Sequence, residues 1–206
     1  GPRNKSGCLM LSLTRYQGVG TKGIPLNISW NQLVDSSLQV VTEKTRATST
    51  GYYSLKAPHE RKDANVLTKH CLVYDLDHTS LSFDKLVENL APYEALITTT
   101  YSHNPEANEN KYRVIINTDR DIDSDEYQSL FNGFIKKNLF LLGQVDTSVR
   151  DKSRLFLDWS CPPERQKFAR KEVINGKPIN VDEILDFDKK IQLDDEQKKQ
   201  IGDIPR

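Results

Sequence analysis

Residues 69–78 read Lys-His-Cys-Leu-Val-Tyr-Asp-Leu-Asp-His, an apolar run that ends in two carboxylates spaced two residues apart. The apolar run predicts a buried strand. Because strand side chains alternate between faces, Asp75 and Asp77 should leave the strand on the same side. Two carboxylates held this close repel each other unless a cation lies between them, and a hard oxygen site of this kind suits Mg²⁺ or Mn²⁺. Divalent-metal chemistry on phosphates is therefore the first hypothesis.

The elements after this strand follow a regular order. Ser82 precedes a helical apolar stripe over 83–90, and the β-branched and aromatic residues of 95–101 and 112–116 predict a hairpin with a long, turn-rich tip. A capping box of Asp123 and Glu126 predicts a second helix, which carries the stripe Tyr127, Leu130, Phe131, Phe134 and Ile135. A last strand is expected at 154–159.

The resulting order, βαββαβ, predicts an α+β fold in which four strands form one antiparallel sheet of the RRM-like or ferredoxin-like kind. Both helices should cover one face of this sheet and leave the other open for function. Residues 71–163 would form this core, 3–70 an N-terminal α/β portion of the same domain, and 164–206 a peripheral helical and charged segment. No internal repeat interrupts these parts.

The flanking parts contribute further elements. A strand is expected at 8–15 and another at 51–56, and a helix should follow Asn180. Ser29 and Gln32 form a capping box for a helix whose apolar stripe would be Trp30, Leu33, Val34, Leu38 and Val41.

Composition limits the class of protein. The 29 basic and 29 acidic residues balance, so contact with nucleic acid would rely on local basic clusters. No apolar run approaches bilayer length, and no signal peptide is evident. The three cysteines lie far apart in the sequence and have no CxxC spacing, so neither a disulfide framework nor a zinc site is indicated. A reducing cytoplasm fits best. The opening Gly1-Pro2 is typical of a cleaved tag, and we expect an excised domain of a longer protein.

Other chemistry-bearing residues lie downstream of the paired acids. His103 comes at the end of a predicted strand, where it should face the same open side of the sheet as Asp75 and Asp77. Asp146 follows an apolar residue, and Arg154 opens the last predicted strand. A third acid and an anion-binding base are thus available.

These motifs, YDLDH, then TTTYSHNPE and KYRVII, then VDTSVRDKSRLF, resemble in their order the archaeo-eukaryotic primase superfamily. The resemblance is to the primase-polymerase branch of phages, plasmids and other mobile elements. Members carry acid-x-acid, small-x-His and hydrophobic-Asp motifs over an RRM-like core. Here Tyr101 stands two residues before the histidine, so Thr100 or Ser102 could instead be the small position.

The resemblance implies a site and a chemistry. Asp75, Asp77 and Asp146 would hold two metals roughly 3.5–4 Å apart for template-directed nucleotidyl transfer, with Asp151 as a rival for the third acid. The resemblance also implies four residues that bind the nucleoside triphosphate, which could be a ribonucleotide or a deoxynucleotide: His103, Arg113, Lys152 and Arg154. The implied partners are a single-stranded DNA template and a fused or associated replicative helicase.

Two other functions remain open. The stretch Val73 to Thr79 also resembles the haloacid-dehalogenase phosphatase signature, in which Asp75 would be the nucleophile, although the hairpin that follows does not suit the parallel sheet of that family. A non-catalytic RRM-like module would bind single strands by stacking bases on exposed aromatic residues, but its aromatic-rich strands are missing.

Overall fold

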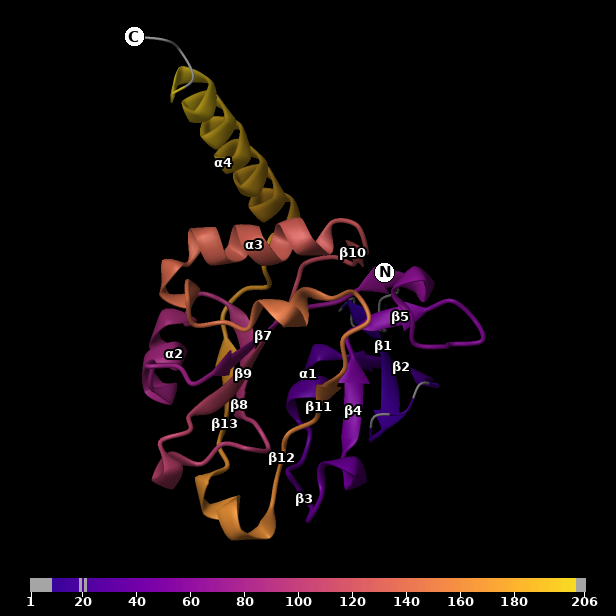
Figure 1. The fold of residues 1–206 in the computed structure, drawn as a ribbon. Coiled ribbons are helices and arrows are strands. Elements are labelled where there is room, and N and C mark those ends of the chain that lie inside the picture. The colour runs from indigo at the N-terminus through magenta and orange to yellow at the C-terminus, as the bar shows by residue number, and fades with distance from the viewer. Residues whose placement is uncertain (1–8, 19, 21, 203–206) are drawn as a thin grey trace.

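The computed structural model describes residues 9–18, 20 and 22–202, and its fold is α+β, as the order of elements predicted (Figure 1). The helices are α1 (Trp30–Val34), α2 (Phe83–Asn89), α3 (Tyr127–Lys137) and α4 (Val181–Gly202). The strands are β1 (Met10–Gln17), β2 (Ile24–Ser29), β3 (Gln39–Val40), β4 (Thr48–Gly51), β5 (Tyr53–Leu55), β6 (Val66–Lys69), β7 (Leu72–Asp77), β8 (Glu94–Thr99), β9 (Lys111–Ile116), β10 (Ile122–Asp123), β11 (Phe156–Leu157), β12 (Ser160–Cys161) and β13 (Lys171–Asn175).

The central sheet is antiparallel and has the order β13-β8-β9-β7. The hairpin β8–β9 is confirmed, and β9 lies between β7 and β8. The face that carries Tyr74 and Tyr112 is covered by both helices, since the Tyr74 ring lies 4.5 Å from that of Phe131 on α3 and the Tyr112 ring 5.5 Å from that of Phe83 on α2. The opposite face, with Asp75, is therefore turned away from both helices.

The fourth strand of this sheet is not the one predicted. The stretch 154–159 contains only β11, which pairs with β4 in a second sheet of order β11-β4-β1-β2, whereas β13 closes the central sheet beside β8. Asp158 fixes β11 there, because its carboxylate accepts hydrogen bonds from the hydroxyls of Thr48 (2.5 Å) and Thr50 (2.7 Å). The sequence of β13, an edge strand, contains only two apolar residues, Val173 and Ile174, so its pattern was weak.

The capping box at Ser29 is confirmed, but the helix that it starts is shorter than predicted. It ends at Val34, and the ammonium of Lys171 donates hydrogen bonds to the carbonyls of Val34 and Ser36, both at 2.8 Å. Leu38 and Val41 therefore lie outside the helix. Leu33 nevertheless belongs to the same buried cluster as the central sheet, so the N-terminal part and the sheet share one core.

Helices α3 and α4 pack closely against each other. Only half of the predicted capping box precedes α3: the backbone N–H of Asp123 donates to the Glu126 carboxylate, while Glu126 itself is the N-cap residue. The first turns of α4 contact α3 beside Gly133, and the rest of α4 extends away from the body (Figure 1). Among the described residues, no helix has the length and apolar character needed to cross a membrane.

Candidate active site

The paired acids of β7 lie directly opposite paired bases of β9. In the antiparallel register, Asp75 faces Arg113 and Asp77 faces Lys111. The prediction that the two acids share a face is therefore confirmed. The sheet brings an acid-x-acid strand against a base-x-base strand on the face turned away from α2 and α3. The prediction that this face is open was wrong for most of it: Val73, Leu96 and Ile115 are buried there, because the N-terminal part packs against it.

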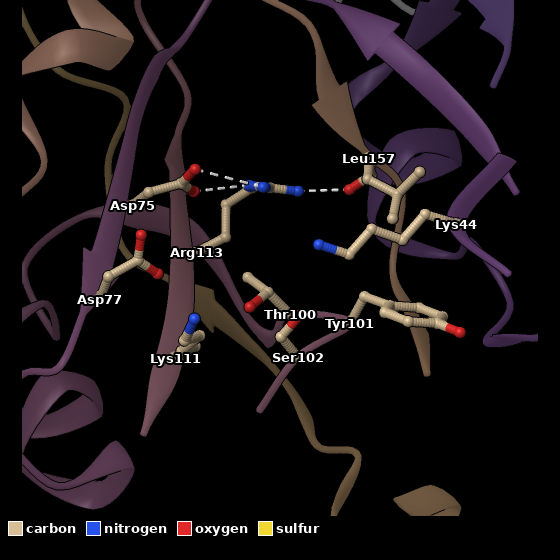
Figure 2. Close-up of a pocket in the computed structure, with 9 residues that line it drawn as sticks. All are labelled: Lys44, Asp75, Asp77, Thr100, Tyr101, Ser102, Lys111, Arg113 and Leu157. Carbon is tan, nitrogen blue, oxygen red and sulfur yellow. Dashed lines mark hydrogen bonds and ion pairs between the residues drawn. The ribbon is translucent and has the colours of Figure 1, made fainter. Parts of the chain in front are cut away.

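Asp75 and Arg113 form a two-pronged ion pair. The Nε and Nη2 atoms of Arg113 donate to the two carboxylate oxygens of Asp75 at 2.7 and 3.3 Å, and its Nη1 donates to the carbonyl of Leu157 on β11 (Figure 2). Both side chains are largely buried, with exposed fractions of 12% for Arg113 and 14% for Asp75. Burial alone would lower the pKa of the Arg113 guanidinium, but the Asp75 carboxylate outweighs it and raises that pKa. Arg113 is thus a fixed cation.

A pocket of about 200 Å³ opens beside this pair, between the central sheet and the N-terminal part (Figure 2). Its lining holds two acids, three bases and three hydroxyl side chains: Asp75, Asp77, Lys44, Lys111, Arg113, Thr100, Tyr101, Ser102 and Leu157. Asp77 is exposed, and among the described residues it has no ion pair. The mixture of charges suits a ligand that carries both a cation and phosphate groups.

Asp146 lies beside the paired acids through its backbone. Its N–H donates to the carbonyl of Asp75 at 2.8 Å, which holds the 3₁₀ turn Thr147–Arg150 against β7. The Asp146 carboxylate accepts from the backbone N–H of Ser148 and does not line the pocket. Across the part of the chain that the structure describes, no three His, Cys, Asp or Glu side chains are grouped to hold a metal ion.

His103 is close to the pocket but does not line it. Only 9% of the residue is exposed, and its Nδ1 accepts a hydrogen bond of 3.1 Å from the backbone N–H of Lys111. Burial lowers the pKa of its imidazole, which favours the neutral ring. Because Nδ1 accepts, the proton of the neutral ring is on Nε2, which is the donor that a phosphate oxygen would need.

Lys152, Arg154 and Asp151 follow the turn and are absent from the pocket lining. The carbonyl of Lys152 accepts from the ammonium of Lys69, and the neighbouring Ser153 donates to the carboxylate of Asp63. This segment is thus held by the N-terminal part. The roles proposed for these three side chains stay predictions.

Sequence reasoning assigned no role to Lys44 or Lys111, which both line the pocket. Lys111 could have been found, since it lies two residues before Arg113 on the same strand and must share its face. Lys44 comes from a 3₁₀ helix, Lys44–Arg46, far away in the sequence, and its ammonium lies 5.7 Å from the centre of the Tyr101 ring. No local pattern connects these two residues.

The donor set fits a hard divalent cation in chemical type. Asp77 offers both carboxylate oxygens, and Asp75 keeps further lone pairs on the two oxygens that Arg113 engages. Carboxylate oxygens are the ligands that Mg²⁺ and Mn²⁺ prefer. The free carboxylate of Asp77 and the Arg113-bound carboxylate of Asp75 nevertheless form a weaker cage than three free carboxylates would.

Comparisons with known proteins identify the family and the fold of the chain. The sequence matches the family described as VapE N-terminal domain over residues 50–195. The fold is similar to the solved AEP domain of the primase-polymerase of cyanophage S-2L, with a TM-score of 0.52 and 14% sequence identity over 86% of this chain and 89% of that one. A search of curated proteins gives no match. The chain therefore belongs to the VapE N-terminal domain family and has the fold of an archaeo-eukaryotic primase domain.

Proposed function

We propose that this domain is a primase-polymerase that transfers nucleotides from nucleoside triphosphates to a strand on a single-stranded DNA template. The observation that carries the proposal is the pocket in which Asp75 and Asp77 face Arg113 and Lys111. A divalent metal bound to a triphosphate presents both charges that these pairs complement. The similarity to the AEP domain of a cyanophage primase-polymerase supports the same reading.

The roles follow from position and charge. Asp75 and Asp77 would hold Mg²⁺ or Mn²⁺, which supplies charge neutralisation and activation of the attacking hydroxyl. Lys111, Arg113 and Lys44 would bind the triphosphate oxygens, because each is a cation on the pocket wall. His103 would support this wall, since its ring holds the backbone of Lys111.

Asp146 is proposed as the third acid. Its backbone bond to Asp75 keeps it next to the strand that carries the pair. Its carboxylate would have to leave the N–H of Ser148 to reach a metal, a change that costs one exposed hydrogen bond of about 1 kcal/mol. A template, a nucleotide and a fused or associated replicative helicase complete the proposed set of partners.

The alternatives have less support. A phosphatase nucleophile needs a free carboxylate, whereas both oxygens of Asp75 are engaged by Arg113. A stacking module needs exposed aromatic residues on one sheet face, and on the face turned away from the helices β7 and β9 present Asp75, Asp77, Arg113 and Lys111.

The direct test is incorporation of labelled nucleotides on single-stranded DNA, with ribo- and deoxynucleotides, in the presence and absence of Mg²⁺ or Mn²⁺. Asp77→Asn should reduce metal-dependent incorporation by about 100-fold or more, because it removes a metal ligand and leaves the buried pair intact. Asp186→Asn, at an exposed acid on α4, is the matched control and should match the unchanged protein. Equal incorporation by both variants would refute the proposal.

A further inference from the structure

The ion pair between Asp75 and Arg113 raises a question about the order of binding. Of the two acids of the pocket, only the more buried one is paired, and its partner is also a candidate for the triphosphate. A metal that binds Asp75 must therefore sit close to the guanidinium that already holds both of its oxygens. The metal ion and the guanidinium are both positive, and like charges this close in a partly buried site repel strongly.

From this geometry we propose that Arg113 couples the two halves of the ligand, so that the pocket binds a divalent metal tightly only together with a triphosphate. The inference rests on the proposed function and adds to it a rule of assembly. Before the ligand binds, Arg113 blocks the metal site by holding both oxygens of Asp75. It releases Asp75 when phosphate oxygens offer it a better set of acceptors.

The charge balance of the pocket supports this coupling. Three basic side chains face two acidic ones in its lining. A divalent cation alone adds to this excess of positive charge, whereas a metal–triphosphate complex is an anion and offsets it. Neither half of the ligand is well matched by itself, because a triphosphate alone would meet the carboxylate of Asp77.

The geometry of Arg113 gives it a fixed pivot. Its Nη1 donates to the carbonyl of Leu157 and its guanidinium lies 5.0 Å from the centre of the Phe156 ring, so β11 holds the side chain from the side opposite to Asp75. A small rotation about this support would bring Nε and Nη2 off Asp75 while the contact with β11 persists. Guanidinium binds phosphate by the same two-pronged geometry that it uses for a carboxylate.

The test measures binding without turnover. Mn²⁺ is titrated into the protein by calorimetry, with and without saturating nucleoside triphosphate whose α,β-bridging oxygen is replaced by an imido group. For the unchanged protein, we expect the analogue to tighten Mn²⁺ binding by about tenfold or more, within the usual range of coupling between sites.

Variants of Arg113 distinguish the effect of its two-pronged bond to Asp75 from the effect of its positive charge. Arg113→Met should tighten binding of Mn²⁺ alone, weaken binding of the analogue, and reduce the coupling to about twofold or less. Arg113→Lys keeps the charge without the fork, and its Mn²⁺ affinity should fall between those of the other two proteins. Lys111→Met is the matched control, because it removes a cation from the same strand face and Lys111 has no bond to Asp75. It should weaken binding of the analogue, while the coupling stays larger than in Arg113→Met.

The outcomes are distinct. The coupling would be overturned if Mn²⁺ bound the unchanged protein equally well with and without the analogue. It would also be overturned if the unchanged protein and Arg113→Met had equal affinities for Mn²⁺. In both cases metal-dependent incorporation would continue. Absence of Mn²⁺ binding to every protein under every condition would overturn the proposed function as well. Thermal unfolding of each variant shows whether it is folded, and if Arg113→Met is not, Arg113→Lys decides the question alone.

Discussion

The ammonium of Lys69 donates a hydrogen bond of 2.7 Å to the carbonyl of Lys152, across 83 residues of sequence. Only 2% of Lys69 is exposed, and its Nζ lies 4.2 Å from the centre of the Tyr127 ring and 5.3 Å from that of Tyr53. Lys69 thereby ties the segment after Asp146 to the strand that precedes β7. A buried lysine thus helps to position the loop of the proposed third acid.

The pH dependence of stability should report on this lysine. Burial lowers the pKa of Lys69 to about 7, against opposing attraction by Asp63 and Asp151. Between pH 7 and about 10, the folded chain has released this proton while the unfolded chain still holds it, so the free energy of unfolding should rise with pH by roughly 1 kcal/mol per unit. Urea unfolding at pH 7, 8 and 9 measures this slope.

Lys69→Met removes the titrating group and should flatten the slope relative to the unchanged protein. Lys189→Met, at an exposed lysine on α4, is the control and should keep the slope. A slope that is equal in all three proteins would show that Lys69 keeps its ordinary pKa in the folded state.

The two acids of β7 should differ in their effect on stability. Asp75→Ala leaves the guanidinium of Arg113 buried without its partner and should lower the free energy of unfolding by about 3 kcal/mol. Asp77→Ala removes an exposed carboxylate and should change it by less than about 0.5 kcal/mol. Chemical denaturation of both variants gives the comparison, and equal losses would mean that the pair in Figure 2 does not persist in solution.

Triphosphate binding should depend on cations of the pocket wall and not on those of the segment after Asp146. Lys111→Met should raise the dissociation constant of the imido analogue with Mn²⁺ by about tenfold, since it removes a cation from the pocket wall. Arg154→Met should change it by less than about twofold, because Arg154 does not line the pocket. The reverse result would move the triphosphate to the segment that the sequence resemblance indicated.

The contact between α3 and α4 depends on a glycine. A Cβ atom at Gly133 would lie 2.9 Å from the Cβ of Asp188 and 3.1 Å from the Cγ2 of Ile184. Gly133→Ala should therefore lower the free energy of unfolding by about 1 kcal/mol, since overpacking outweighs the better helix propensity of alanine. Asn132→Ala on the same helix is the control. Proteolysis of α4 and thermal unfolding measure the effect, and a stabilised Gly133→Ala would show that α4 moves away freely.

Local chemistry decided much of this fold. Alternation along β7 placed Asp75 and Asp77 on one face, and the residues of 95–116 specified a hairpin. Ser29 caps α1 as predicted, because a cap depends only on residues within one turn. The family resemblance rested on the same short motifs.

Only the tertiary structure decided which strands and which cations meet. Short apolar runs such as 154–159 fit either sheet, and the hydroxyls of Thr48 and Thr50 bound Asp158 to the N-terminal one. The register of β9 set Arg113 and Lys111 against the acids, and the packing of the N-terminal part added Lys44. Sequence spacing fixes faces and caps because these depend on neighbours in the chain, whereas pairing and pocket lining depend on contacts between residues that only the folded core brings together.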